Sequence, residues 1–281
     1  GMVKRWVLAA CMLGLAAAGK AEIKFIVGPA TVPIGDDAEI KVPDGWRFVP
    51  KESMKEFDEK TKNLYNDQEL GVLLAPQNLA GGFWAFFDFD WTGYIKDAAS
   101  EKLDADDMWT SMVKNNATAN EERQKLGYPT SEMIGWVLQP KYNPQNQRLE
   151  WAYKFHSKYG DTINYATRIL GRKGVMRVTV VPMGSLDKMY PQLDRALAGF
   201  DYKTGSRYAE YIKGDKVAEV GLAALVVGGL GAAAASTGLL AKLWKFIVLG
   251  FVAASSAIKR WWNKWFGRKG DRGDGSGPGG Q

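Results

Sequence analysis

Residues 149–181 read LEWAYKFHSKYGDTINYATRILGRKGVMRVTVV. Apolar side chains take every second position in three successive runs, which is the period of a β-strand. The SKYGD and GRKG segments between the runs have the composition of turns. With a further apolar run at Met133–Leu138 and a turn region at Pro140–Gln147, the stretch predicts a four-stranded antiparallel meander over residues 131–182.

Helices are predicted on either side of the meander. Asp104 can cap a helix that Gly127 and Pro129 terminate. After the meander, a second helix begins at Ser185, or at Pro191 if the proline occupies its first turn. The meander therefore lies between two helices along the chain.

Further strands and a helix precede these elements. Residues 22–49 predict a strand, a turn and a strand, and Ser53–Tyr65 predicts a short helix with an apolar face. Leu70–Ala75 and Phe83–Trp91 read as strands. Two strands, a helix, two strands, a helix, four strands and a helix predict an α+β domain over residues 22–202, with an antiparallel sheet and helices packed on it.

The C-terminal part predicts a membrane anchor. Residues 217–258 read VAEVGLAALVVGGLGAAAASTGLLAKLWKFIVLGFVAASSAI, with charge only at Glu219, Lys242 and Lys245. A spanning helix needs about 20 apolar residues, so the run predicts a transmembrane helical anchor of one or two arms that meet near Ser236. Its first arm covers Val217–Ala235. A helical hairpin buried in a soluble core is the alternative.

The flanks of the anchor bear on its topology. A polar linker, residues 203–216, precedes it, and residues 259–281 form a basic aromatic flank with a disordered Gly-rich tail. Basic flanks favour the cytoplasmic side, which favours a single crossing, while two crossings stay open. The lipid bilayer is the expected partner, and Gly228 and Gly229 can support a homo-oligomer through this arm.

Residues 1–21 resemble a secretory signal peptide, with a basic start, an apolar run and small residues at the end. Cys11, the one cysteine of the chain, also fits a lipoprotein box, so lipidation is the alternative to cleavage. Both predictions place the soluble domain outside the cytoplasm. A mature chain without cysteine excludes disulfides, thiol catalysis and cysteine-ligated metals.

The charge distribution excludes a polyanion-binding domain. Residues 22–216 carry 26 basic and 28 acidic side chains, so the net positive charge of the chain lies at its two ends. A nearly neutral domain offers no field for nucleic acid, and no nucleic-acid partner is expected. The chain also lacks a nucleophile elbow, a P-loop and a dinucleotide fingerprint, so we expect no catalytic residues and no cofactor.

A polar and aromatic group of side chains is the candidate binding site. Asn164 and Arg168 share one face of a predicted strand, and Arg172 follows in the next turn. With Trp84 or Trp136 they can form a surface that binds a partner. The alternative is a partly covered sheet face on which the arginines are paired.

Two aspartates are a weaker candidate, for a metal. Asp88 and Asp90 are spaced by two on a predicted strand and so project from one face. Together with a neighbouring carboxylate they can bind a hard cation. A solvated sheet face explains the same spacing.

Several motifs stand in a characteristic order along the chain. They are GPATVPIG at 28–35, GYP at 127–129, GW at 135–136, PKY at 140–142, NYATRILGRKG at 164–174, and KVA through GLAAL at 216–225. With them, the chain resembles the bacterial membrane-anchored family called domain of unknown function 2167 over about residues 28–266. More loosely, its element order is similar to PsbP-like domains, which is an analogy of fold alone.

The resemblance implies a bacterial membrane-anchored protein and supplies no activity. With the signal-like N-terminus, we expect a protein of the inner membrane whose soluble domain faces the periplasm or exterior. The missing catalytic motifs, the aromatic content and the anchor favour a non-enzymatic binding or scaffold module of the cell envelope with an envelope protein as its partner. The alternative is an envelope hydrolase or cation-dependent enzyme that uses the aspartates.

Overall fold

The computed structural model describes residues 22–61, 67–76, 81–125, 127, 129–183 and 185–228. The predicted signal peptide, the anchor beyond Gly228 and the tail at residues 259–281 lie outside the described residues. The signal peptide and the number of crossings therefore stay predictions.

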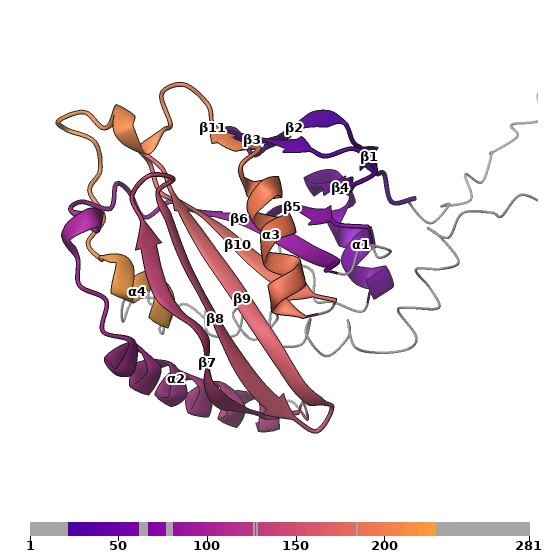
Figure 1. Cartoon of the computed structure of the whole chain (residues 1–281), viewed down its shortest axis with the longest axis vertical. Helices are drawn as coiled ribbons and strands as arrows, with labels where there is room; N and C mark the ends of the chain where they lie inside the picture. Colours follow the sequence, from indigo (N-terminus) through magenta and orange to yellow (C-terminus); the bar gives the residue numbers. More distant parts are fainter. Residues whose placement is uncertain are drawn as a thin grey trace, which may run out of the picture.

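Two antiparallel sheets form the frame of the described domain (Figure 1). The large sheet has the strand order β1 (Ile26–Val27), β4 (Arg47–Pro50), β5 (Glu69–Leu74), β6 (Phe83–Asp90), β10 (Val175–Pro182), β9 (Gly160–Leu170), β8 (Arg148–Ser157) and β7 (Ser131–Asn143). The small sheet has the order β11 (Phe200–Tyr202), β3 (Ala38–Val42) and β2 (Ala30–Ile34). The α+β prediction with an antiparallel sheet is confirmed.

The predicted meander is also confirmed, as β7 to β10. Its alternation has the expected cause, because Tyr165 and Ile169 enter one core of buried side chains while Ala166 and Leu170 enter another on the opposite face. The turn predicted at Pro140–Gln147 is shorter than expected, since β7 continues through Pro140. Proline is tolerated there because β7 is an edge strand whose register shifts between Leu138 and Lys141.

One face of the large sheet is covered by the small sheet and by α3 (Leu186–Leu197). Buried residues from all three layers form this core, among them Ile40 of the small sheet, Val178 of the large sheet and Leu193 of α3. Helix α3 begins directly after Ser185, so Pro191 lies inside the helix and does not start it.

The opposite face is covered at its two ends. Helix α1 (Met54–Thr61), preceded by η1 (Lys51–Ser53), packs on the end formed by β4, β5 and β6. At the other end α2 (Ala105–Lys125) runs along β7, and α4 (Leu222–Val227) packs beside it (Figure 1). The cap predicted for α2 is confirmed, because an Asp104 carboxylate oxygen accepts bonds from the amides of Asp106 and Asp107, both at 3.0 Å.

The N-terminal region holds more strands than its composition indicates. Four strands, β1 to β4, occupy the part where two were predicted. Gly35 and Gly45 adopt φ values of 62° and 74° in the turns that separate the later three strands. These left-handed conformations favour glycine and allow turns too short to interrupt the apolar pattern.

Residues 203–216, expected to be a linker, lie against the domain and include η3 (Tyr208–Glu210). The amide of Lys203 donates to the Asp37 carbonyl at 2.8 Å, and the amide of Tyr94 donates to the Lys216 carbonyl at 2.8 Å. Another short helix, η2 (Ala98–Ser100), precedes α2. The segment is thus part of the folded body.

The predicted first arm of the anchor is described only up to Gly228. In this part a continuous helix from Val217 is wrong, because α4 has six residues and ends at Gly228 with a φ of 89°. Leu222 and Leu225 of α4 are buried against α2 and the sheet. None of the helices in the described residues is long and apolar enough to cross a membrane.

Candidate functional site

A cleft opens where α2 and α4 meet strands β8, β9 and β10, with a volume of about 160 Å³. We call it the α2 cleft. Its apolar walls include Met112, Met133, Trp151, Phe155 and Val226, and its polar lining includes Asn115, Asn116, Arg123, Tyr153, Asn164, Arg168 and Thr179. Two of the predicted binding residues, Asn164 and Arg168, therefore lie together at one site.

Strand β9 positions Arg168 in the cleft. Its guanidinium carbon lies 4.8 Å from the centroid of the Trp151 ring, and its Nη1 donates to the Thr167 carbonyl at 3.0 Å. Burial lowers the pKa of Arg168 to about 9, helped by Arg177, which still leaves the side chain charged at neutral pH. Among the described residues no carboxylate forms an ion pair with Arg168.

Helix α2 supplies a second guanidinium, which sequence analysis missed. Arg123 is 2% exposed, and its Nη1 donates to the side-chain oxygen of Asn120 at 2.5 Å. Asn120 and Asn116 are in turn held by Ser131, whose carbonyl accepts from both amide side chains at 2.7 and 2.8 Å. The Nε and Nη2 groups of Arg123 have no hydrogen-bond partner within the described part of the chain.

Tyr153 lies within electrostatic range of both arginines. Burial raises the pKa of its hydroxyl to about 12, and the charges of Arg123 and Arg168 partly oppose that shift. The hydroxyl therefore stays protonated at neutral pH and can donate a hydrogen bond. The cleft combines two cations, a neutral phenol and amide side chains, a set suited to an acceptor-rich ligand.

Helix α4 closes one side of the cleft and is fixed at both ends. The Glu101 carboxylate accepts bonds from the amides of Leu222 and Ala223 at 2.6 and 2.9 Å. At the other end, the Asn115 side chain donates to the Val227 carbonyl at 3.1 Å. A Cβ at Gly221 would lie 2.4 Å from the Glu101 carboxylate, so a larger residue there would displace the carboxylate that accepts the α4 amides.

The two tryptophans proposed for the site lie elsewhere. Trp84 is 2% exposed and packs beneath α1, so its place in a binding surface was wrong. Trp136 donates its Nε1 to the Ala105 carbonyl at 3.2 Å and packs edge-on against Trp109, which holds the start of α2 on β7. Trp151 provides the aromatic surface that was assigned to them.

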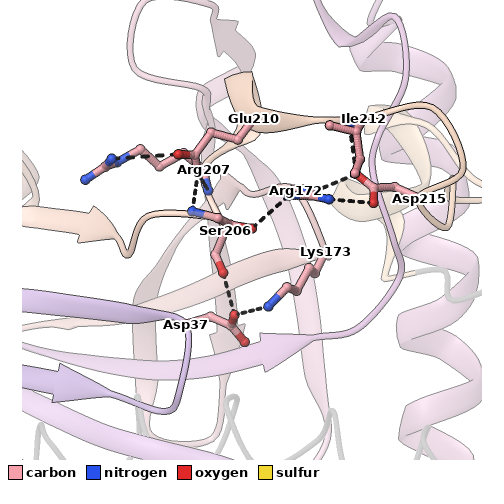
Figure 2. A network of polar contacts seen from close by, with 9 residues as sticks. Asp37, Arg172, Lys173, Ser206, Arg207, Glu210, Ile212 and Asp215 are labelled. Carbon is pink, nitrogen blue, oxygen red and sulfur yellow. Dashed lines mark hydrogen bonds and ion pairs between the residues drawn. The ribbon is translucent and has the colours of Figure 1, made fainter.

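Arg172 is also outside the cleft, in a polar network that holds residues 203–216 (Figure 2). Its Nε and Nη2 donate to the two carboxylate oxygens of Asp215 at 2.6 and 2.8 Å. Close by, Asp37 accepts bonds from Lys173 at 2.7 Å and from the Ser206 hydroxyl at 2.5 Å. Arg172 thus fixes the C-terminal segment to the domain.

This network predicts an acid-sensitive attachment. Bonds from Arg172 and from the Ile212 amide lower the pKa of Asp215 to about 2. A depressed folded-state pKa stabilises the attachment above the ordinary range of an aspartate and loses that effect as the pH falls towards 2. We expect pepsin to cut the wild-type chain near Tyr208 and Tyr211 slowly at pH 4 and fast at pH 2.

Arg172→Ala is the matched variant for that experiment, because it removes both side-chain donors to Asp215. It should be cut quickly at both pH values. Equal cleavage rates of the wild-type and variant chains at pH 4 would show that the ion pair does not hold the segment. Cleavage inside the buried strand β6 serves as a monitor of global acid unfolding.

The two aspartates proposed for a metal lie near two arginines, Arg177 and Arg168, whose charges act on Asp90. Asp88 is buried, and its Oδ1 accepts from Arg177 Nη2 at 3.1 Å. Asp90 lines a different depression of about 1190 Å³ beside Trp91 and Lys216, and burial raises its pKa. In the described ranges no three histidine, cysteine, aspartate or glutamate side chains form a group that could hold a metal ion.

A signal for the missed residues was present in the sequence. Ser157 pairs with Gly160 across a two-residue turn, which fixes the register and sets Trp151 opposite Ala166, beside Arg168. On α2, the helical period carries the inward stripe from Met112 to Arg123. If the helical period of the inward stripe is continued from Met112 through polar residues, it places Arg123 on the same side of α2.

The comparisons with known proteins agree with the family resemblance. No curated protein matches the chain in sequence. The solution structure of cyanobacterial PsbP (CyanoP) from Synechocystis sp. PCC 6803 is similar to 66% of this chain and 95% of its own, with 12% identity and a TM-score of 0.35. A family model described as "Protein of unknown function (DUF2167)" matches residues 26–258. The chain therefore belongs to the DUF2167 family.

Proposed function

We propose that this chain is a membrane-anchored binding module of the bacterial cell envelope, with its α+β domain outside the cytoplasmic membrane and the α2 cleft as its ligand site. The signal-like residues 1–21 and the apolar run to residue 258 support the location. An envelope component is the partner expected at that location.

The observation that carries the proposal is the place of the cleft in the chain. Helix α4 forms one wall of the cleft, through Val226 and Val227, and the apolar run of the sequence continues directly from its C-cap residue, Gly228. If that run enters the bilayer, the cleft lies at the membrane-proximal end of the domain. A ligand in the cleft would then be reached from the membrane surface.

The chemistry of the lining supports binding over turnover. Among the described residues that line the cleft are arginine, asparagine, tyrosine and tryptophan, with no carboxylate, histidine or cysteine. The hydroxyls of Ser131 and Thr179 would need an adjacent general base to act as nucleophiles, and histidine and carboxylates are the side chains that mainly supply one. Donors and apolar walls are what a recognition site requires.

Cysteine labelling tests the location. Cys11 is the one natural cysteine, so Ser185→Cys on the domain and Ser276→Cys in the tail give new single labels. In spheroplasts, an impermeant maleimide should label the exposed residue 185, and should label residue 276 only after lysis. The parent chain, without an introduced cysteine, is the control for background labelling. Labelling of residue 185 only after lysis would place the domain in the cytoplasm and contradict the proposal.

Photo-crosslinking tests the use of the cleft. A benzophenone side chain at position 164 lies in the cleft, and one at position 145 lies in the exposed turn between β7 and β8. We expect an adduct in membranes for position 164 that position 145 does not give. The same products from both positions, or none from either, would contradict a binding role for the cleft.

A further inference from the structure

The arginines of the α2 cleft differ from three other arginines of the described domain in lacking an ion pair with a carboxylate. Arg148, Arg172 and Arg177 are each paired with a carboxylate: Glu150, Asp215 and Asp88, respectively. Within the described residues, Arg123 and Arg168 form no such pair. The charges of Asp88 and Asp90 reach the half-buried Arg168, but in the described part of the chain neither guanidinium has a carboxylate in contact with it, and a buried charge without a direct partner is costly.

The groups left without partners on Arg123 have a specific geometry. Nε and Nη2 are the two nitrogens through which Arg172 holds both oxygens of Asp215, at 2.6 and 2.8 Å. In Arg123 the same two nitrogens have no partner in the described part of the chain, while Nη1 is held by Asn120. A guanidinium fixed in this way matches a carboxylate or phosphate in a bidentate arrangement.

The volume limits the size of the bound group. A cavity of about 150 Å³ holds a molecule the size of benzene, whereas sites for drug-sized ligands have about 300–1,000 Å³. At about 160 Å³, the α2 cleft accepts one headgroup or one short acid. Met112, Trp151 and Phe155 provide apolar contacts beside the two cations.

We propose that the α2 cleft binds the oxyanion of a phosphate- or carboxylate-bearing ligand, with Arg123 as its bidentate donor and Arg168 as its second cation. This inference rests on the proposed function, which makes the cleft a ligand site. A lipid headgroup at the membrane surface and a free anion in the same compartment share this chemistry.

Calorimetric titration of the full chain in a neutral detergent distinguishes the two sources. The probes are dihexanoyl-phosphatidylglycerol below its micelle concentration, dihexanoyl-phosphatidylcholine, and inorganic phosphate. Binding of the phosphatidylglycerol alone identifies an anionic lipid headgroup, and binding of inorganic phosphate as well identifies a free oxyanion site. Failure of all three probes to bind the folded wild-type chain would overturn the proposal.

Variants connect the binding to the arginines. A hydrogen bond to a charged group contributes about 1.5–3 kcal/mol, so Arg123→Gln and Arg168→Gln should each weaken binding by about 10- to 150-fold. Arg195→Gln removes an exposed arginine of α3 outside the cleft and should leave binding unchanged. Equal weakening by Arg195→Gln would overturn the proposal in favour of nonspecific attraction.

Two controls keep the result interpretable. Arg123→Lys keeps the charge but not the bidentate geometry, so it should bind less tightly than the wild type and more tightly than Arg123→Gln. If Arg123→Gln fails to unfold cooperatively, Arg168→Gln decides the result. If no probe binds while position 164 still gives its specific adduct, the anion assignment is wrong and the binding module stands.

Discussion

Replacing Trp84 with alanine should lower the free energy of unfolding by about 3–5 kcal/mol, the usual cost of truncating a large buried aromatic residue. The side chain is 2% exposed and lies between β6 and α1. Its ring packs edge-on against Phe57, with centroids 5.3 Å apart, and lies 6.4 Å from Phe86. Removing it leaves a cavity that the surrounding aromatic residues can fill only in part.

Chemical denaturation of the full chain in detergent, followed by circular dichroism, measures this loss. Trp84→Phe keeps an aromatic ring in the site and should cost much less. Trp91→Ala removes a side chain that is 58% exposed and should also have a small effect. A loss below about 1 kcal/mol for Trp84→Ala would indicate a surface position, as the binding-site prediction from sequence required.

Tyr202→Phe should cost about 1–3 kcal/mol, the penalty for leaving a buried polar group without its partner. The Tyr202 hydroxyl donates to the Ile169 carbonyl at 2.7 Å and accepts from the Met176 amide at 2.9 Å, so it joins β9 and β10 to the small sheet. Burial raises the pKa of this hydroxyl, which therefore stays protonated. Phenylalanine fills the same space and removes both bonds.

Hydrogen exchange gives a local measure of the same change. The Met176 amide should exchange about 5- to 150-fold faster in Tyr202→Phe, which is that free energy expressed as a ratio. Tyr211→Phe is the matched control, because Tyr211 is exposed and its ring stacks on Tyr94. Unchanged exchange at Met176 would show that the hydroxyl bridge does not stabilise the strand pair.

Local patterns predicted those parts of the fold that local physics determines. The alternation of apolar and polar residues predicted strands β7 to β10 and the face on which each side chain lies. The capping residue Asp104 predicted the start of α2. Residues 203–216 were misread because their polar composition is that of a linker. Their partners, such as Arg172 for Asp215, lie far away in the chain, and no local pattern reveals such a pairing.

The grouping of the candidate residues was predicted in part, for a related reason. Asn164 and Arg168 line the same cleft, as their shared strand face predicted, because the face of a single strand follows from alternation. The prediction that Trp84 lies beside Arg168 was wrong because β10 separates β6 from β9. Strand order is a property of the whole sheet and does not follow from a local pattern. Arg123 was missed because an arginine near the end of a helix resembles a solvent-facing residue.

The attachment of residues 203–216 also limits how far the domain can move relative to residue 228. A flexible polar chain of that length would have a root-mean-square end-to-end distance of about 20 Å. The domain could then change its distance and orientation relative to the residues that follow the segment. Because Arg172, Asp37 and Tyr94 hold the segment, and Asn115 holds the end of α4, that slack is absent up to Gly228. The α2 cleft therefore keeps a fixed distance and orientation relative to residue 228.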